Sequence, residues 1–414
     1  MLNYSVNFDW RTMNNISQKK YGYITRPVMV LSMVSLFTDM ASEMLYPVMP
    51  VFLASIGFSV FLIGLLEGFV EMLAGIGKGY FGQLSDMRQQ RVPFVRWGYI
   101  LSAVSKPMLA LSTSAIWIFF SRSVDRTGKG LRTSPRDALL SSQTTPENKA
   151  KVFGFPRGMD TLGAVIGPSI ALLFLWMQPG DYNQLFLLAF IPGAAAVIFT
   201  FRLKEKKGTP SQKKIHLFSY LSYFRSAPKG YNRLVTGLIV FALVNSSDVL
   251  LMLKMKEAKM ADTAIIGVYI FYNLVYALSA FPIGMLADKF GMKKIFIIGL
   301  LLFVIVYAGF AVNDEPVIFL VLFFIYGLYA AATEGIAKAW ISNLAPARET
   351  GTAIGAYASL SSIAAFIAST SAGALWYGFG APVAFGFTAA VTAVVAVYLS
   401  TLRYSAVSST SADN

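Results

Sequence analysis

The 414-residue chain has no cysteine, a single histidine and few charged residues. The lack of cysteine excludes disulfide bonds, thiolate metal sites and cysteine nucleophiles. His216 lies in a lysine-rich polar segment, so a buried histidine proton relay is not expected. Charged residues make up 14% of the chain and hydrophobic residues 56%, which is more apolar surface than one soluble core of this length can bury. The composition therefore predicts a protein embedded in a lipid bilayer.

Acidic residues are also scarce, with 21 of them against 35 basic residues and a formal net charge of +14. In a soluble protein this excess would suggest a nucleic-acid partner. Here the basic residues concentrate between apolar segments, as the positive-inside rule expects, and no nucleic-acid signature accompanies them. Residues 1 to 26 lack the apolar core and cleavage site of a signal peptide, so we expect a cytosolic leader.

A membrane helix needs about 20 mostly apolar residues, and twelve segments meet this requirement. They are residues 28 to 55, 60 to 83, 93 to 113, 115 to 141, 152 to 177, 182 to 202, 232 to 255, 263 to 288, 292 to 312, 316 to 343, 350 to 377 and 380 to 402. An even number of spans places both chain ends on one side. The lysine and arginine residues of the loops predict that this side is the cytosol, with only Lys254, Lys256 and Lys259 dissenting.

These spans predict five parts of the chain. They are a cytosolic leader (1 to 26), a six-helix bundle (27 to 203), a cytosolic linker (204 to 230), a second six-helix bundle (231 to 403) and a cytosolic tail (404 to 414). The loop composition thus predicts a multi-pass protein of a bacterial-type inner membrane.

One loop signature occurs twice, nearly half the chain apart. The first copy contains Gly82, Asp86 and Arg88, and the second contains Gly284, Asp288 and Lys289. Each copy ends a long apolar segment. A repeat of this length, carried by membrane helices, predicts two homologous helical bundles.

At these residues the chain resembles the major facilitator superfamily of secondary transporters, over essentially its whole length. The family's loop pattern is G-x-L-A-D-[RK]-x-G-[RK]-[RK]; residues 284 to 294 match it closely, whereas the first copy has Gln89 where glycine is usual. The resemblance implies an all-α membrane protein with twelve transmembrane helices in two pseudo-symmetric six-helix bundles. It also implies that Asp86 and Asp288 cap a neighbouring helix and latch the bundles on the cytosolic side. The alternative is that each only forms a turn.

The fifth span carries Gly163-x-x-x-Gly167-Pro168, which resembles the core of the antiporter motif of this superfamily. The closing glycine pair is absent, because Ala171 and Leu172 occupy those positions. The motif favours export, and the alternative is that these small residues only form a packing seam.

The fourth span carries an unusual load of charge for a membrane helix. Its members are Arg122, Asp125, Arg126, Lys129, Arg132 and Arg136, which at 100° per residue fit an arc of roughly 120°. Each ionisable group at bilayer depth costs about 2.5 to 3.5 kcal/mol, so it normally faces a watery cavity or a partner. The resemblance places this helix beside the substrate path, and arginine suits carboxylate or phosphate recognition. We therefore predict that Arg122, Arg126, Lys129 and Arg132 bind an anionic substrate. The alternative is a structural ion-pair network with the acids Asp39, Glu43, Glu67, Glu71 and Asp160.

Without a histidine in the membrane, a proton carrier has to be a carboxyl group. Asp39 and Glu43 are the leading candidates, followed by Glu67, Glu71 and Asp125. The second bundle offers Asp248 and Tyr272 for substrate binding. Tyr269, Tyr272, Asn273 and Tyr276 form either an aromatic wall or a packing face, and Glu334 and Lys338, one turn apart, are expected to form an intrahelical ion pair.

Together these features predict a proton-coupled secondary transporter that works by alternating access as a monomer, with no cofactor and no resident metal. The expected substrate is a small organic anion or zwitterion, including polycarboxylate metal chelates and siderophores, with export favoured. The alternative is a multidrug or metal-cation/proton antiporter that uses the acids of the first two helices. A membrane-embedded enzyme would need a nucleophile or a metal site, and neither stands out.

Overall fold

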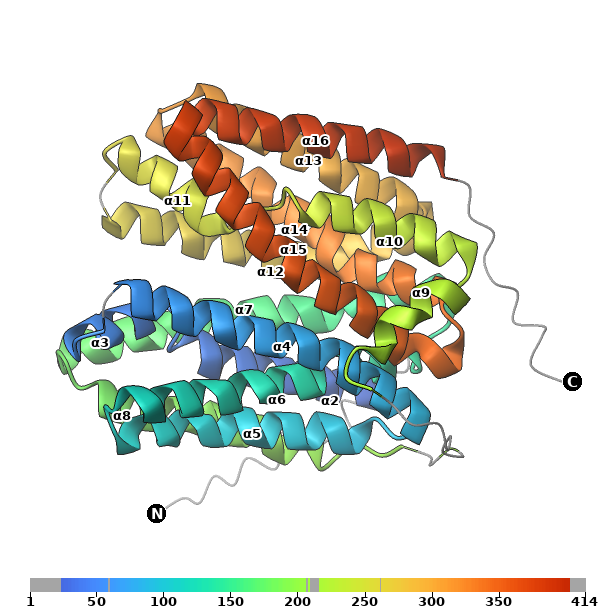
Figure 1. Cartoon of the computed structure of the whole chain (residues 1–414), viewed down its shortest axis with the longest axis horizontal. Coiled ribbons are helices and arrows are strands. Elements are labelled where there is room, and N and C mark those ends of the chain that lie inside the picture. Colours follow the sequence, from blue (N-terminus) through green and yellow to red (C-terminus); the bar gives the residue numbers. More distant parts are fainter. Residues whose placement is uncertain (1–23, 59, 206–207, 209–215, 261, 403–414) are drawn as a thin grey trace, which may run out of the picture.

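The computed structural model describes residues 24 to 402, apart from residues 59, 206–207, 209–215 and 261. The described residues form helices, turns and loops without any strand. Figure 1 shows two bundles of roughly parallel helices, the first coloured blue to green and the second yellow to red. Nearly all of the predicted leader and tail lie outside the described residues.

The helices follow the predicted spans. The first bundle contains α2 (Arg26–Glu43), α3 (Met49–Ser55), α4 (Val60–Arg88), α5 (Val92–Leu111), α6 (Ala115–Ser141), η1 (Pro146–Asn148), α7 (Lys149–Met177) and α8 (Tyr182–Thr200). The second contains α10 (Lys229–Ala242), α11 (Asp248–Glu257), α12 (Asp262–Phe290), α13 (Met292–Val312), α14 (Pro316–Leu344), η3 (Ala347–Glu349), α15 (Thr350–Phe379) and α16 (Ala381–Thr401). The fold is the expected all-α arrangement of twelve spans in two six-helix bundles.

Two predicted spans, the first and the seventh, are each divided into two helices. Pro47 lies in the break between α2 and α3, where a proline removes a backbone N–H and disfavours helix at the preceding residue. Between α10 and α11, the Ser247 hydroxyl accepts a hydrogen bond from the Val249 N–H at 3.3 Å and caps the new helix. Local sequence therefore causes each division.

Seven stretches of the described chain are long and apolar enough to cross a membrane, judged by length and composition. They are Pro146–Met177, Tyr182–Thr200, Gly267–Phe290, Met292–Val312, Pro316–Leu344, Ala347–Phe379 and Ala381–Thr401. Five of the seven belong to the second bundle. Helix α6 does not qualify, because charged residues occupy much of its length.

The two bundles repeat the same helix pairings. In the first, α6 packs on α4 and α5, and α5 packs on α8; in the second, α14 packs on α12 and α13, and α13 packs on α16. Between the bundles, α4 contacts α15 and α7 contacts α12. Glycine permits these contacts, because a Cβ on Gly82 would lie 2.4 Å from the Gly351 carbonyl oxygen and one on Gly154 would lie 2.5 Å from that of Ala280.

The connection between the bundles folds against them in η2 (Ser219–Ser222) and α9 (Tyr223–Ser226), at the right of Figure 1. We call this end of the bundles the linker end. Tyr220 is 1% exposed and lies between α4 and α15. Its hydroxyl is 2.8 Å from the Ser359 Oγ, and a Cβ on Gly79 would lie 2.5 Å from its ring. The linker therefore contributes a side chain to the contact between the bundles.

Candidate functional site

A cavity of about 510 Å³ lies inside the first bundle and reaches Tyr269 of α12 and Lys338 of α14. Nine basic residues line it: Lys78, Lys106, Arg122, Arg126, Lys129, Arg132, Arg136, Arg157 and Lys338. Five acidic residues line it: Asp39, Glu43, Glu71, Asp125 and Asp160. The wall of the cavity therefore has an excess of basic residues.

Helix α6 supplies the largest share of this charge. The four basic residues predicted to bind substrate, Arg122, Arg126, Lys129 and Arg132, all line the cavity. The two glycines of the same stretch approach other helices, since a Cβ on Gly128 would lie 2.6 Å from the Gly98 carbonyl oxygen and one on Gly130 would lie 3.0 Å from the Gly77 Cα. These glycines hold α6 against α5 and α4, and the longer basic side chains reach the cavity.

Many of the basic groups have an acidic partner. Lys106 Nζ lies 2.8 Å from Asp125 Oδ1, and Glu71 lies 3.6 Å from both Lys78 Nζ and Arg126 Nη1. Ion pairs within 4.0 Å engage at least six of the nine basic residues of the wall. The ammonium group of Lys129 makes no hydrogen bond or ion pair with any described residue. The predicted network and an open basic surface therefore coexist in one cavity.

Sequence reasoning missed Lys78 and Lys106. Each is the one lysine of its helix, and a lysine inside a predicted membrane span is the signal that could have identified it. Arg157 was missed for a similar reason: it stands beside Pro156 near the start of α7, away from the charged stretch of α6.

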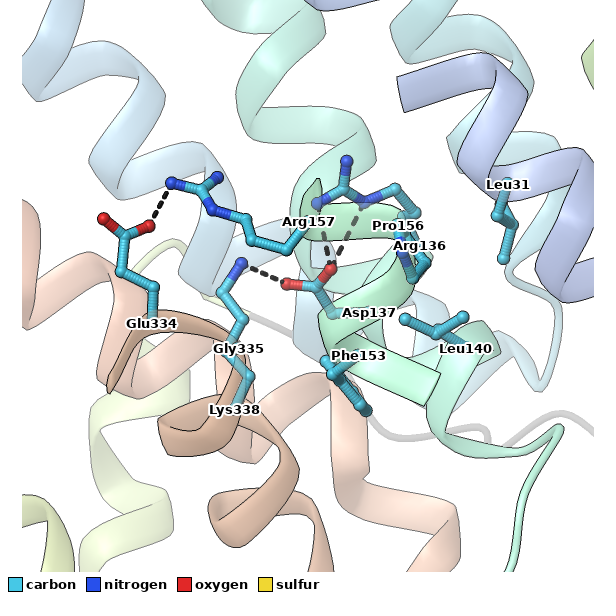
Figure 2. A pocket seen from close by; sticks show the side chains of 10 residues that line it. All are labelled: Leu31, Arg136, Asp137, Leu140, Phe153, Pro156, Arg157, Glu334, Gly335 and Lys338. Atoms are coloured by element: carbon cyan, nitrogen blue, oxygen red, sulfur yellow. Dashed lines mark hydrogen bonds and ion pairs between the residues drawn. The ribbon is translucent and has the colours of Figure 1, made fainter. Parts of the chain in front are cut away.

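Six charged residues of alternating sign join the two bundles, and we call them the cross-bundle ion chain. In order they are Glu334, Arg157, Asp160, Arg136, Asp137 and Lys338. Figure 2 shows all of them except Asp160. Arg157 Nη2 binds Glu334, and Arg157 Nη1 lies 3.0 Å from Asp160 Oδ2. The chain begins and ends on α14 and passes through α7 and α6 of the first bundle.

The second half of the cross-bundle ion chain leads back to α14. Arg136 lies 3.8 Å from Asp160 and 3.2 Å from Asp137, and Lys338 Nζ lies 2.8 Å from Asp137 Oδ2. The predicted intrahelical pair between Glu334 and Lys338 is therefore wrong. These two residues are one turn apart, but each binds an opposite charge that the first bundle presents to α14.

The proposed coupling acids lie beside the ion chain. Asp39 and Glu43 of α2 line the cavity, and the carboxyl group of Asp39 faces that of Asp160. Arg136 Nη1 also donates to Ser35 Oγ of α2 at 3.0 Å, which ties this helix to α6. Glu71 and Asp125 are the paired acids described above, and the side chain of Glu67 lies outside the described side chains. Two carboxyl groups in contact form a place that can hold one extra proton.

The predicted substrate residues of the second bundle are not brought to this cavity. Asp248 Oδ1 accepts a hydrogen bond from the Tyr326 hydroxyl at 2.6 Å. The buried ring of Tyr272 stacks on Tyr326 with centroids 5.0 Å apart. Of the suggested aromatic wall, Tyr269 lines the cavity, and the Tyr276 hydroxyl accepts from Arg157 Nε at 2.6 Å. Aromatic packing thus accounts for Tyr272.

The two copies of the loop signature make reciprocal contacts between the bundles. Asp86, at the end of α4, accepts from the Thr352 N–H at 2.6 Å and its hydroxyl at 3.0 Å, in the first turn of α15. Asp288, near the end of α12, accepts from the N–H groups of Ala150 and Lys151 at 2.9 and 3.0 Å, in the first turn of α7. Each aspartate therefore caps a helix of the other bundle.

The basic residue that pairs with Asp86 is not one of those named in the loop signature. Arg88 and Lys289 are exposed, and Arg91 Nη2 is the group that lies 3.0 Å from Asp86. Gly291 adopts φ 99°, and Gln89 adopts φ 50° at the corresponding turn. The first copy thus places a glutamine in the left-handed region that favours glycine.

The antiporter-like glycines of α7 form a packing seam with α2. A Cβ on Gly163 would lie 2.4 Å from the Leu36 carbonyl oxygen, and one on Gly167 would lie 2.5 Å from that of Met40. In this structure both glycines serve close helix contact.

Comparison with known proteins places this geometry in a family. Residues 31–271 and 249–413 match the sequence model of the Major Facilitator Superfamily. An uncharacterized MFS-type transporter of Methanocaldococcus jannaschii is 34% identical over 85% of this chain and 89% of its own. A homolog of the multi-drug resistance efflux pump PmrA from Lactococcus lactis is 23% identical over 79% of this chain and 82% of its own.

Solved structures have the same fold. The crystal structure of the human organic anion transporter MFSD10 aligns with a TM-score of 0.78 at 17% identity, covering 90% of this chain and 99% of that one. A bacterial homologue of the iron transporter ferroportin, in an outward-facing state, aligns with a TM-score of 0.70 at 17% identity, covering 91% and 98%.

Proposed function

The chain belongs to the Major Facilitator Superfamily, and from that premise we propose that it is a proton-coupled secondary transporter of small organic anions or zwitterions. The observation that carries this proposal is the wall of the large cavity, where nine basic residues face five acidic ones. An arginine or lysine at bilayer depth is costly unless it has a partner. An anionic substrate supplies the missing negative charge, and polycarboxylates are the first class to test.

Alternating access requires the linker end to open. There, the cross-bundle ion chain and the two capping aspartates hold the bundles together. A substrate anion that reaches Lys338 or Arg157 competes with Asp137 or Glu334 for the same cation. Substrate binding thereby weakens the contacts that must separate.

We propose that Asp39 carries the coupled proton. Glu43 lies one turn further along α2 and lines the same cavity. Because Asp39 faces Asp160, a proton on either carboxyl group removes the repulsion between them and alters the charge opposite Arg136 and Arg157. The proton site and the ion chain thus share Asp160.

Binding by purified protein tests the substrate class, with thermal stabilisation as the readout. Citrate is expected to stabilise the protein, and Lys129→Gln should weaken the affinity for citrate by roughly tenfold or more, the range for a hydrogen bond to a charged group. The exposed Lys229 at the start of α10 provides the matched control, Lys229→Gln. Unchanged citrate affinity in Lys129→Gln would contradict the anion site.

A charge exchange separates substrate contact from structural pairing at Arg126. If Arg126 serves only as the partner of Glu71, the double variant Arg126→Glu with Glu71→Arg should restore both protein yield and citrate affinity. Restored yield with affinity still lost supports an anion contact.

We also propose that the linker end faces the cytosol of a bacterial-type inner membrane. Because the chain has no cysteine, His216→Cys and Asp314→Cys, both at exposed positions, report its orientation by labelling. Labelling of Asp314→Cys alone from outside intact cells is expected, and labelling of His216→Cys alone would reverse the orientation.

A multidrug exporter is the second candidate, favoured by the name of the Lactococcus lactis relative. The same relative supports export as the direction we propose. Stabilisation by the lipophilic cation tetraphenylphosphonium, with none by citrate, would favour this candidate over the anion transporter.

A further inference from the structure

A second cavity, of about 180 Å³, lies within the second bundle and has a different lining. Its apolar side includes the rings of Phe241, Phe296 and Tyr329. Its polar side includes Asn245, Thr333, Glu334, Tyr357 and Ser361. We call it the aromatic compartment. Lysine and arginine are absent from its lining among the described residues, so its chemistry is unlike that of the basic cavity.

The two cavities meet at one ion pair. Glu334 lines the aromatic compartment, and its carboxylate binds Arg157, which lines the basic cavity. This pair forms the partition between the compartments. A substrate carboxylate that replaces Glu334 on Arg157 would therefore stand at the entrance to the aromatic compartment.

Asn245 indicates what the compartment accepts. Its Oδ1 atom is buried and has no hydrogen-bond partner among the described residues. An unsatisfied buried carbonyl oxygen is costly, and a ligand that donates a hydrogen bond removes that cost. The residue stands in the break between α10 and α11, where the chain leaves its helix at a cavity wall.

Resting on the proposed anion transport, we propose that the aromatic compartment binds the ring of an amphipathic organic anion that carries a hydrogen-bond donor, such as a phenol, while its carboxylates bind in the basic cavity. The aromatic side chains contact the ring face, because offset and edge contacts between rings add to simple burial. The side-chain carbonyl oxygen of Asn245 accepts a hydrogen bond from the donor on the ligand. The basic cavity then selects for charge, and the aromatic compartment selects for the organic body.

Three probes separate these contributions in full-length protein. Succinate carries two carboxylates only, phthalate adds a ring, and 4-hydroxyphthalate adds a donor to the ring. We expect phthalate to bind at least tenfold more tightly than succinate, and 4-hydroxyphthalate to bind about threefold to tenfold more tightly than phthalate, as one net hydrogen bond allows. Isothermal calorimetry measures each affinity.

Two variants assign these gains to the compartment. Ala365 lines it, so Ala365→Leu should fill part of the space and reduce the affinity for phthalate to that for succinate, while the affinity for succinate is unaffected. Asn245→Leu should remove only the gain from the hydroxyl group. Ala390→Leu, at an exposed position of α16, is the matched control.

The outcomes distinguish this inference from the function on which it rests. If none of the three probes binds, the anion function fails and this inference fails with it. Equal affinity for all three probes, or ring selectivity that survives Ala365→Leu, overturns the aromatic compartment alone and leaves the anion function standing.

Discussion

Helices α6 and α14 occupy equivalent places in the two bundles, but their side chains differ. Along α6, a basic face lines a cavity. Along α14, Tyr326 stacks on Tyr272 and on Tyr329, with centroids 5.0 and 5.2 Å apart, and the helix contributes only Glu334 and Lys338 to the charge at the interface. The repeat therefore preserves the helix packing, whereas the side chains differ between the bundles. Charged residues are concentrated in the first bundle and packed aromatic residues in the second.

The largest expected effect is the loss of proton coupling when an acid of the first bundle is replaced. We expect Asp39→Asn to abolish proton-driven accumulation of substrate in proteoliposomes while substrate binding survives, because an amide cannot take up and release a proton. Glu43→Gln should have the same effect. The matched variant in the second bundle, Asp248→Asn, should retain coupling. If the Asp248 variant loses coupling and the other two keep it, the proton site belongs to the second bundle.

Substitution of Arg157 tests how much the cross-bundle ion chain stabilises the contact between the two bundles. Arg157→Gln removes the partner of Glu334 and one partner of Asp160. Asp160 is buried, whereas Glu334 is 44% exposed, so we expect a fall in the unfolding temperature in detergent that comes mainly from the lost partner of Asp160. The double variant with Glu334→Gln should recover part of this loss. An unchanged unfolding temperature would mean that the ion chain contributes little.

The two capping aspartates sharpen the comparison. The degenerate first motif suggests a weaker contact at Asp86, but Asp86 accepts two hydrogen bonds from Thr352 and pairs with Arg91, whereas Asp288 accepts two from backbone N–H groups. We therefore expect Asp86→Asn to shift the population toward forms open at the linker end more than Asp288→Asn does. Each shift should be on the order of 1 to 3 kcal/mol.

Spin-label distances across the linker end measure this opening, and the absence of native cysteine simplifies the labelling. Distances that stay unchanged in both variants would reduce the two aspartates to turn-forming residues.

The smallest expected effect is at the turn that follows each aspartate. Gly291→Ala should destabilise the protein by about 1 kcal/mol, because an L-residue pays this cost in the left-handed region. Gln89→Gly should change stability less, since relief at φ 50° is offset by the lost hydrogen bond from Gln89 Nε2 to the Asp86 carbonyl oxygen. A larger loss from Gln89→Gly would show that this side chain is the main stabiliser of the turn.

Those features of the molecule that depend on local sequence could be predicted. Segment length gave the twelve spans, the double motif gave the two bundles, and helical periodicity placed Arg126 and Lys129 on one face of α6. Partner choice could not be predicted in the same way. Glu334 and Lys338 are neighbours on α14, and their partners Arg157 and Asp137 lie on other helices far away in the sequence.

Tyr220 gives the connection between the bundles a mechanical role. Its hydroxyl bonds to Ser359 on α15, and its ring rests against Gly79 on α4. Any motion that parts these two helices must break one of the two contacts and uncover a phenol ring that is now 1% exposed. The energy of the open form therefore depends on which helix Tyr220 follows. In the proposed transport cycle the linker is a third moving part, and shortening or cutting it would alter the rate of opening as well as the tether.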